Sequence, residues 1–252
     1  MNKLVIISFA TAILLLSGCG SSSSSNKDAE SNTTDTAASA TIANPTTNNN
    51  TITNWTPITT KVSCDPKELI MAGSTLDFKY YSDGDIKVEC QTINGFTIAN
   101  YKLDDNITSL DITQLIKTEV MDGSVKDDKG INASFDGVTT YDYKAGTQHI
   151  KGDYTYNGKT ENIDCVETYP TILPRTISNE NDISNLLNWE GDDLGEYTST
   201  TCPESYYDEE NDLDIEDENI NWSGNININT NYTLTDSTGK QHLISTEMSM
   251  KK

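Results

Sequence analysis

Three pairs of strand-like segments joined by tight-turn residues constrain the fold of this chain most strongly. Asp83-Gly84 and Asn157-Gly158 join the first two pairs, and the run from Asp236 to Gly239 joins the third. Asx-Gly dipeptides accept the positive φ angles of a type I′ turn, whose twist matches that of paired strands. The sequence therefore predicts three antiparallel hairpins: Leu76–Tyr81 with Asp85–Cys90, His149–Tyr156 with Thr160–Val166, and Asn225–Thr235 with Gln241–Met248.

Composition supports strands elsewhere too. Thr, Asn, Ile, Val and Tyr are plentiful while Leu and Ala are sparse, a balance that favours sheets over helices. Gly137–Tyr143 reads as a further strand.

Two segments have apolar residues three and four apart and are predicted to be short helices, Ser109–Lys117 and Glu180–Trp189. Each follows a predicted hairpin and a cysteine, at a period of about 72–75 residues. This order suggests two related units in tandem, residues 61–130 and 131–252, although a chance self-match gives the same pattern. The predicted fold class is α+β, dominated by antiparallel hairpins.

The first residues carry the pattern of an export signal. Lys3 supplies one positive charge, and the apolar run Leu4–Leu16 is too short to cross about 30 Å of hydrocarbon. The run ends Leu16-Ser17-Gly18-Cys19, which resembles the lipobox of bacterial lipoproteins cut by signal peptidase II. The resemblance implies that residues 1–18 are removed and that Cys19 carries acyl chains such as palmitate.

Lipid on Cys19 would fix the location of the protein. Each buried CH₂ contributes about 0.8 kcal/mol, so several chains anchor stably to a bilayer. Gly20, where an aspartate would signal inner-membrane retention, favours the outer membrane of the cell envelope. The sequence leaves open which face of that membrane the protein occupies.

Residues 19–60 contain mostly Ser, Thr, Asn and Ala and too few apolar residues to form a core. We expect a disordered tether with a root-mean-square span of about 35 Å. The globular domain is then 61–252.

Four cysteines remain in that domain, Cys64, Cys90, Cys165 and Cys202. An even count in an exported chain indicates disulfides, and four cysteines permit three pairings. Loop length and the suggested repeat favour Cys64–Cys90 and Cys165–Cys202. No CxxC spacing supports a zinc site among the cysteines.

The formal net charge is −22, and no Lys or Arg occurs from Thr176 to Gly239. This charge disfavours nucleic acid as a partner. Four acids at its densest part are candidate Ca²⁺ ligands: Asp208, Asp212, Asp214 and Glu216. EF-hand spacing is missing, so a solvated acidic loop without any cofactor is the alternative.

No catalytic motif is present in the sequence. His149 and His242 are the only histidines, and neither has an obvious local partner for acid–base chemistry. Acids are too numerous to single out a glycosidase-like pair.

Paired tyrosines on two strands, Tyr141 with Tyr143 and Tyr154 with Tyr156, could form a glycan platform with Trp189 and Trp222. Stacking that stabilises the sheet is the alternative. The sequence favours a lipid-anchored, non-enzymatic binding or structural module whose protein or glycan partner it does not identify. An envelope hydrolase using Asp and Glu and a calcium-dependent adhesion module are the alternatives.

Overall fold

The computed structural model describes residues 55–65, 69–71, 74–93, 96–128, 130, 132–187, 197–203 and 222–252. Its elements are β1 (Val62–Cys64), β2 (Leu69–Met71), β3 (Ser74–Ser82), β4 (Ile86–Ile93), β5 (Phe96–Leu103), β6 (Leu110–Asp127), β7 (Asn132–Asp142), β8 (Thr147–Tyr156), β9 (Lys159–Thr168), β10 (Arg175–Ile177), α2 (Glu180–Leu187), β11 (Ser199–Thr200), β12 (Trp222–Asp236) and β13 (Gln241–Lys251).

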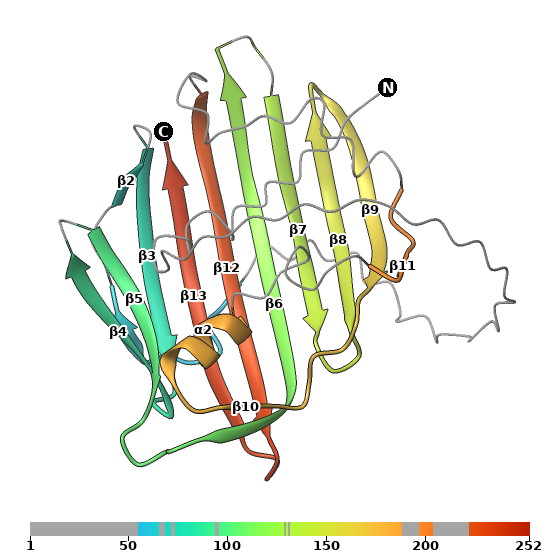
Figure 1. The fold of residues 1–252 in the computed structure, drawn as a ribbon. Helices are drawn as coiled ribbons and strands as arrows, with labels where there is room; N and C mark the ends of the chain where they lie inside the picture. Colours follow the sequence, from blue (N-terminus) through green and yellow to red (C-terminus); the bar gives the residue numbers. More distant parts are fainter. Residues whose placement is uncertain are drawn as a thin grey trace, which may run out of the picture.

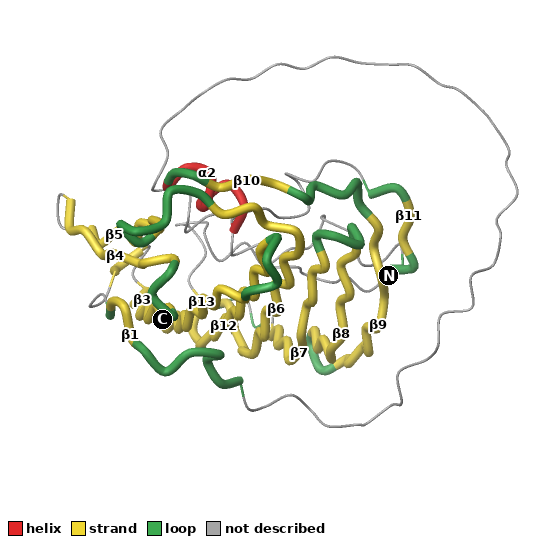
Figure 2. Tube along the Cα trace, turned by 90° about the horizontal axis from the view of Figure 1, so that it is seen from below, coloured by secondary structure: helices red, strands yellow, loops and turns green. Residues whose placement is uncertain are grey.

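One large antiparallel sheet dominates the molecule (Figure 1). Its strands follow the order β1-β3-β13-β12-β6-β7-β8-β9-β11, with β10 paired to β6 and β2 to β3. A separate two-stranded sheet, β4-β5, lies with β10 and α2 along one face of the large sheet (Figure 2). We call this covered face the inner face and the opposite one the outer face. The β-dominated, antiparallel part of the predicted fold class is thus confirmed.

Strict alternation in β12 shows how the sequence sets the two faces. Successive side chains of a strand point to opposite sides, so every second residue shares a face. The buried, inner-facing set is Ile226, Ile228, Thr230, Tyr232 and Leu234, and the half-buried asparagines Asn225, Asn227, Asn229 and Asn231 alternate with it on the outer face. The inner-facing apolar side chains join those of α2 in one core.

Two of the three predicted hairpins are confirmed. β8 and β9 pair across a two-residue turn in which Asn157 and Gly158 both have positive φ angles, 48° and 79°. β12 and β13 pair from Asn225–Lys251 to Thr235–Gln241, as the third prediction requires. The predicted strand at Gly137–Tyr143 is part of β7.

The first predicted hairpin is wrong. β3 pairs with β13 in the large sheet, whereas β4 pairs with β5 in the small one. Asp83-Gly84 is therefore a corner between layers, stabilised by the Asp85 backbone N–H donating to Asp83 Oδ1 at 3.1 Å. An Asx-Gly turn fixes a local reversal but does not select the partner strand.

The helix predicted at Ser109–Lys117 is also wrong, because this segment begins the long strand β6. Ile112 pairs with Asp236 and Gln114 with Thr235, so Thr113 is an extra residue in a β-bulge. The bulge moves Leu115 onto the same buried face as Ile112. That three-residue spacing resembles helical periodicity.

The second predicted helix is confirmed as α2, Glu180–Leu187, and Trp189 lies outside the described residues. At its start, Asn179 Oδ1 accepts the Asp182 N–H at 3.0 Å, and the Asp182 carboxylate accepts the Ser178 N–H at 2.9 Å. These reciprocal bonds satisfy donors that a helix start leaves unpaired. α2 is too short and too polar to cross a membrane.

The structure does not support two tandem units. The proposed first unit has a strand where the second has α2. Strands from both halves also alternate within one sheet, since β3 pairs with β13 and β6 pairs with both β12 and β7.

Both disulfides favoured by the sequence are present. Cys64–Cys90 joins β1 of the large sheet to β4 of the small sheet, and Cys165–Cys202 joins β9 to the chain just after β11. The bridges thus connect the layers at one side and fasten the sheet edge at the other.

The first described segment, residues 55–61, lies across the outer face. Ser245 Oγ accepts the Ile58 N–H at 3.1 Å, and Asn231 Nδ2 donates to the Thr56 carbonyl at 3.3 Å. Because Asn231 and Ser245 are paired on β12 and β13, the segment is fixed to the middle of the sheet.

Candidate functional site

The strongest candidate for a functional site is a cluster of ionisable side chains at the β12–β13 turn. A buried histidine lies at its centre. His242 is 1% exposed, and its two ring nitrogens face two carboxylates. Nδ1 lies 3.1 Å from Asp85 Oδ2, and Nε2 lies 3.1 Å from Asp236 Oδ2. Ionised carboxylates only accept hydrogen bonds, so a ring nitrogen that carries a proton can donate it to the carboxylate beside it.

The turn itself holds Asp236. Its Oδ1 accepts the Thr238 hydroxyl at 2.6 Å and the backbone N–H groups of Thr238 and Lys240 at 2.8 and 3.0 Å. The hydrogen bond from the Thr238 hydroxyl is the main cause that holds the pKa of Asp236 well below its usual range. His242 and the two backbone amides lower this pKa further. Asp236 is therefore a fixed anion.

The corner between β3 and β4 supplies the other acids. Lys240 Nζ lies 2.5 Å from Asp85 Oδ2, and this lysine, followed by His242, lowers the pKa of Asp85. Asp83 Oδ2 accepts the Leu243 N–H at 2.9 Å. One ligand atom from each of Asp83, Asp85 and His242 lies within 4.8 Å of the other two.

Strand pairing brings these distant residues together. β3 pairs with β13, and Ser82 is opposite Ile244, so the corner that follows β3 meets the turn that precedes β13. The expectation that His242 has no local partner is therefore wrong for Asp236, which lies across the same turn, whereas Asp85 is distant in sequence and is brought close by the sheet.

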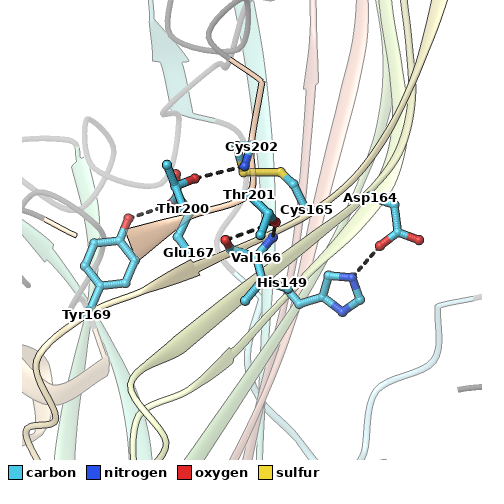
Figure 3. The surroundings of a disulfide bond; sticks show 9 residues. All are labelled: His149, Asp164, Cys165, Val166, Glu167, Tyr169, Thr200, Thr201 and Cys202. Carbon is cyan, nitrogen blue, oxygen red and sulfur yellow. Dashed lines mark hydrogen bonds and ion pairs between the residues drawn. A yellow bond between two sulfur atoms is a disulfide. The ribbon is translucent and has the colours of Figure 1, made fainter. Parts of the chain in front are cut away.

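His149 also has a carboxylate partner on the neighbouring strand. Its Nε2 lies 2.7 Å from Asp164 Oδ1 on the neighbouring strand, and this contact is the main cause lowering the pKa of Asp164 (Figure 3). The two-residue turn at Asn157-Gly158 places Lys151 opposite Asp164, so the register implied a diagonal contact to His149. The pair is on the outer face and about half exposed.

Figure 3 also shows how the edge strand near this pair is held. Thr201 Oγ1 accepts the Val166 N–H at 2.8 Å, and Thr200 Oγ1 accepts the Cys202 N–H at 2.9 Å. The Tyr169 hydroxyl donates to Glu167 at 2.5 Å. These contacts fix the edge around the Cys165–Cys202 bridge.

Lys117 is a second fully buried basic residue. It is 1% exposed on the inner face, 3.3 Å from Glu119 Oε2, with Nζ 5.0 Å from the centre of the Tyr141 ring. Nearby, burial raises the pKa of both Tyr80 and Tyr101, with mutual coulombic effects among the tyrosines as a smaller cause. These phenols stay neutral, and we interpret the group as a buried polar part of the core.

Three aspartates form a row on the outer face. Asp122, Asp136 and Asp153 are directly opposite one another on β6, β7 and β8. A side-chain amide lies at each end of the row. Asn227 Nδ2 donates to Asp122 and Asn162 Nδ2 donates to Asp153, both at 2.9 Å. Burial, followed by repulsion from Asp122 and Asp153, raises the pKa of Asp136.

The remaining sequence-predicted sites have mixed outcomes. Tyr141 stacks on Tyr143 with ring centres 5.9 Å apart, and Tyr154 stacks on Tyr156 at 6.4 Å. All but Tyr156 are buried, as is Trp222, which supports the structural interpretation over a glycan platform. Residues outside the described ranges are Cys19 and the candidate Ca²⁺ ligands Asp208, Asp212, Asp214 and Glu216.

The depressions lined by described residues include a small one and a larger one. One, of about 10 Å³, is bordered by Tyr141, Tyr143 and Tyr169 and has room for about one water. The other, of about 240 Å³, is open and lies between β6, β7 and β12, near Ser124, Asn132 and Ser223. Neither is lined by a histidine.

No known protein family, curated protein or solved structure matches this chain.

Proposed function

We propose that this protein is a lipid-anchored module of the cell envelope that binds a cationic protein partner on the outer face of its large sheet. Cys19 would hold it at the outer membrane through acyl chains, and residues 19–54 would separate the domain from the lipid. The proposal treats the chain as a binding protein without catalysis of its own.

The aspartate row is the observation that supports this proposal. Neighbouring strands are about 4.8 Å apart, and like charges directly opposite one another destabilise a sheet. Asp136 faces Asp122 on one side and Asp153 on the other, and burial, followed by repulsion from these two carboxylates, raises its pKa. A cation docked over the row would relieve the repulsion, and the net charge of −22 would steer such a partner toward the domain.

The histidines support binding over hydrolysis. A general base needs a nitrogen that can accept a proton from substrate. Both nitrogens of His242 already contact carboxylates inside the fold. His149 contacts Asp164 through Nε2, but it is half exposed on a strand surface and lines neither depression, so no enclosed site formed by described residues surrounds it.

The test uses the mature chain with Cys19→Ser and an octalysine peptide as a defined probe. We expect binding that weakens from 20 to 150 mM salt, because the Debye length falls to about 8 Å at 150 mM. Asp136→Asn/Asp153→Asn should weaken binding at low salt by roughly fivefold, the scale of a few exposed charge contacts.

Asp105→Asn/Asp128→Asn is the matched control, since it removes two exposed turn carboxylates and the same charge. Equal loss in both double variants would mean that net charge alone attracts the peptide. That result, or no binding at 20 mM salt, contradicts a docking face at the row.

A further inference from the structure

We propose that Asp83, Asp85 and His242 form a binding site for a divalent transition metal of the Zn²⁺ class, with Asp236 as the residue that orients the histidine ring. This site lies at the β12–β13 turn and does not depend on the proposed function, which concerns the aspartate row.

The three side chains already converge. One oxygen from each aspartate and one ring nitrogen lie within 4.8 Å of one another. Tetrahedral ligands at bond lengths of about 2.1 Å are about 3.4 Å apart, so no separation must shrink by more than about 1.4 Å. Asp83 is exposed and can make this movement, whereas His242 is fixed in the core.

The histidine has the arrangement expected of a metal ligand. A ligating imidazole commonly donates its other ring N–H to a carboxylate, which fixes the tautomer and the ring orientation. Asp236 provides this contact at Nε2, and the turn holds Asp236 through three further hydrogen bonds. Nδ1, on the opposite side of the ring, faces Asp85.

A metal ion would replace charges that already occupy the site. Without metal, the ammonium of Lys240 neutralises Asp85, and His242 Nδ1 lies beside the same carboxylate. The Lys240 side chain is 57% exposed, so its ammonium can leave Asp85 and move into solvent. The carboxylates of Asp83, Asp85 and Asp236 lie around this point, and a dication bound by Asp83 and Asp85 would take the place of the Lys240 ammonium as their counter-ion.

The donor set selects the class of metal. Imidazole nitrogen with two carboxylate oxygens suits Zn²⁺ and its first-row neighbours. Ca²⁺ prefers six to eight oxygen ligands, and Mg²⁺ demands octahedral oxygen coordination. The exposed position of Asp83 leaves room for water as a fourth ligand.

Calorimetric titration of the metal-free mature chain carrying Cys19→Ser with ZnCl₂ tests the site. We expect binding at Asp83, Asp85 and His242 accompanied by proton release, measured by comparing two buffers of different protonation enthalpy. Asp83→Asn keeps an oxygen for the Leu243 N–H and should weaken zinc binding at least tenfold. The exposed-turn variant Asp105→Asn should bind as the parent does, and CaCl₂ should not compete.

Imidazole NMR gives a second readout, because the chain has only two histidines and His149→Gln leaves the His242 signal alone. Zinc should remove the Nδ1 proton of His242 and shift its ¹⁵N resonance, while Nε2–H persists. Retention of the Nδ1 proton at saturating zinc, or unchanged affinity in Asp83→Asn, overturns the proposal. Loss of all binding in Asp212→Asn/Asp214→Asn would overturn it too, because the metal would then belong to the acidic segment.

Discussion

His242 and Lys117 place basic side chains where almost no solvent reaches, and each is 1% exposed. Removing such groups from water costs several kcal/mol unless hydrogen bonds and opposite charges compensate. His242 has two carboxylates and Lys117 has Glu119 with an aromatic ring. At the scale of single residues, stability therefore depends on a few specific pairings inside an otherwise apolar core.

Replacing His242 by leucine should destabilise the fold by about 3–5 kcal/mol, because Asp236 would lose a charge partner in a nearly buried position and Asp85 would keep only Lys240. Urea denaturation measures the change. The matched control is His149→Leu, which removes an exposed pair and should change the free energy of unfolding by less than about 1 kcal/mol. Similar losses in the two variants would contradict the assigned role of His242.

Acid should weaken the same cluster. The pKa values of Asp85 and Asp236 are lowered in the fold, chiefly by Lys240 and by the Thr238 hydroxyl, relative to about 3.9 when unfolded. Their stabilisation is complete above the unfolded value and is lost as pH falls through the lower folded values. Denaturant midpoints measured from pH 6 to pH 2 should fall less steeply in Asp236→Asn than in the parent. If the denaturant midpoint falls equally steeply with pH in Asp236→Asn and in the parent, this turn does not cause the acid sensitivity.

Asp136 should show the opposite sign. Its pKa is raised, so the ionised group destabilises the folded chain at neutral pH. Asp136→Asn should stabilise the protein at pH 7 by about 0.5 kcal/mol, the scale of one unfavourable cross-strand pair. A gain in stability together with a loss of octalysine binding would identify the row as a site kept at the expense of stability.

At the scale of elements, local patterns predicted strands and turns but not which strands meet. The turn at Asn157-Gly158 joins adjacent strands and fixes their register, so the β8–β9 hairpin was predictable. The Asp83-Gly84 turn looks equally suited to a hairpin but leads from one sheet to the other. Which strands pair on either side of it depends on packing against residues far along the chain. The bulge at Thr113 changed the apolar spacing of β6 enough to mimic a helix.

The candidate site was unpredictable for the same reason. It joins residues 83–85 to residues 236–242, and only the pairing of β3 with β13 brings these segments together. Turn chemistry indicated both loops separately. No local signal indicates that the two loops meet.

Two glycines of one hairpin should respond differently to substitution by alanine. Gly158 has φ of 79°, and a Cβ added there would meet no described atom within 4 Å, so Gly158→Ala should cost about 1–2 kcal/mol through backbone strain alone. At Gly152 a Cβ would lie 2.6 Å from both the Asp136 carbonyl oxygen and Gly137 Cα. Gly152→Ala must separate β7 from β8, and the overlap adds to the typical cost of overpacking, about 1–3 kcal/mol. Thermal denaturation ranks the two; a smaller loss at Gly152 would contradict this close approach.

At the scale of the whole molecule, strands from both halves of the domain share the large sheet. The elements on its inner face also come from both halves. The sequence predicted a β-rich, disulfide-bonded chain because alternation and cysteine count are local or compositional properties. It could not predict the second layer, since β4, β5, β10 and α2 are placed by contacts with a core assembled from the entire domain.

The proposed membrane attachment belongs to this scale as well. Cys19→Ser should move the protein from the membrane fraction to the soluble fraction, because a single cysteine would carry every acyl chain. Labelling cells with a palmitate analogue measures the modification directly. Cys64→Ser/Cys90→Ser should keep the label, and labelling that survives Cys19→Ser would refute the lipobox assignment.

The segment that crosses the outer face also determines how the domain would respond to a mechanical load. A pull on the chain before Trp55 is transmitted first to the hydrogen bonds of Thr56 and Ile58 on the β12–β13 pair. These bonds can be peeled away one at a time. Peeling then reaches Cys64, whose covalent link to Cys90 transfers the tension directly to the second layer. Beyond the edge strand β1, the bridge thereby diverts a pull on the chain before Trp55 away from β3 of the large sheet and toward β4.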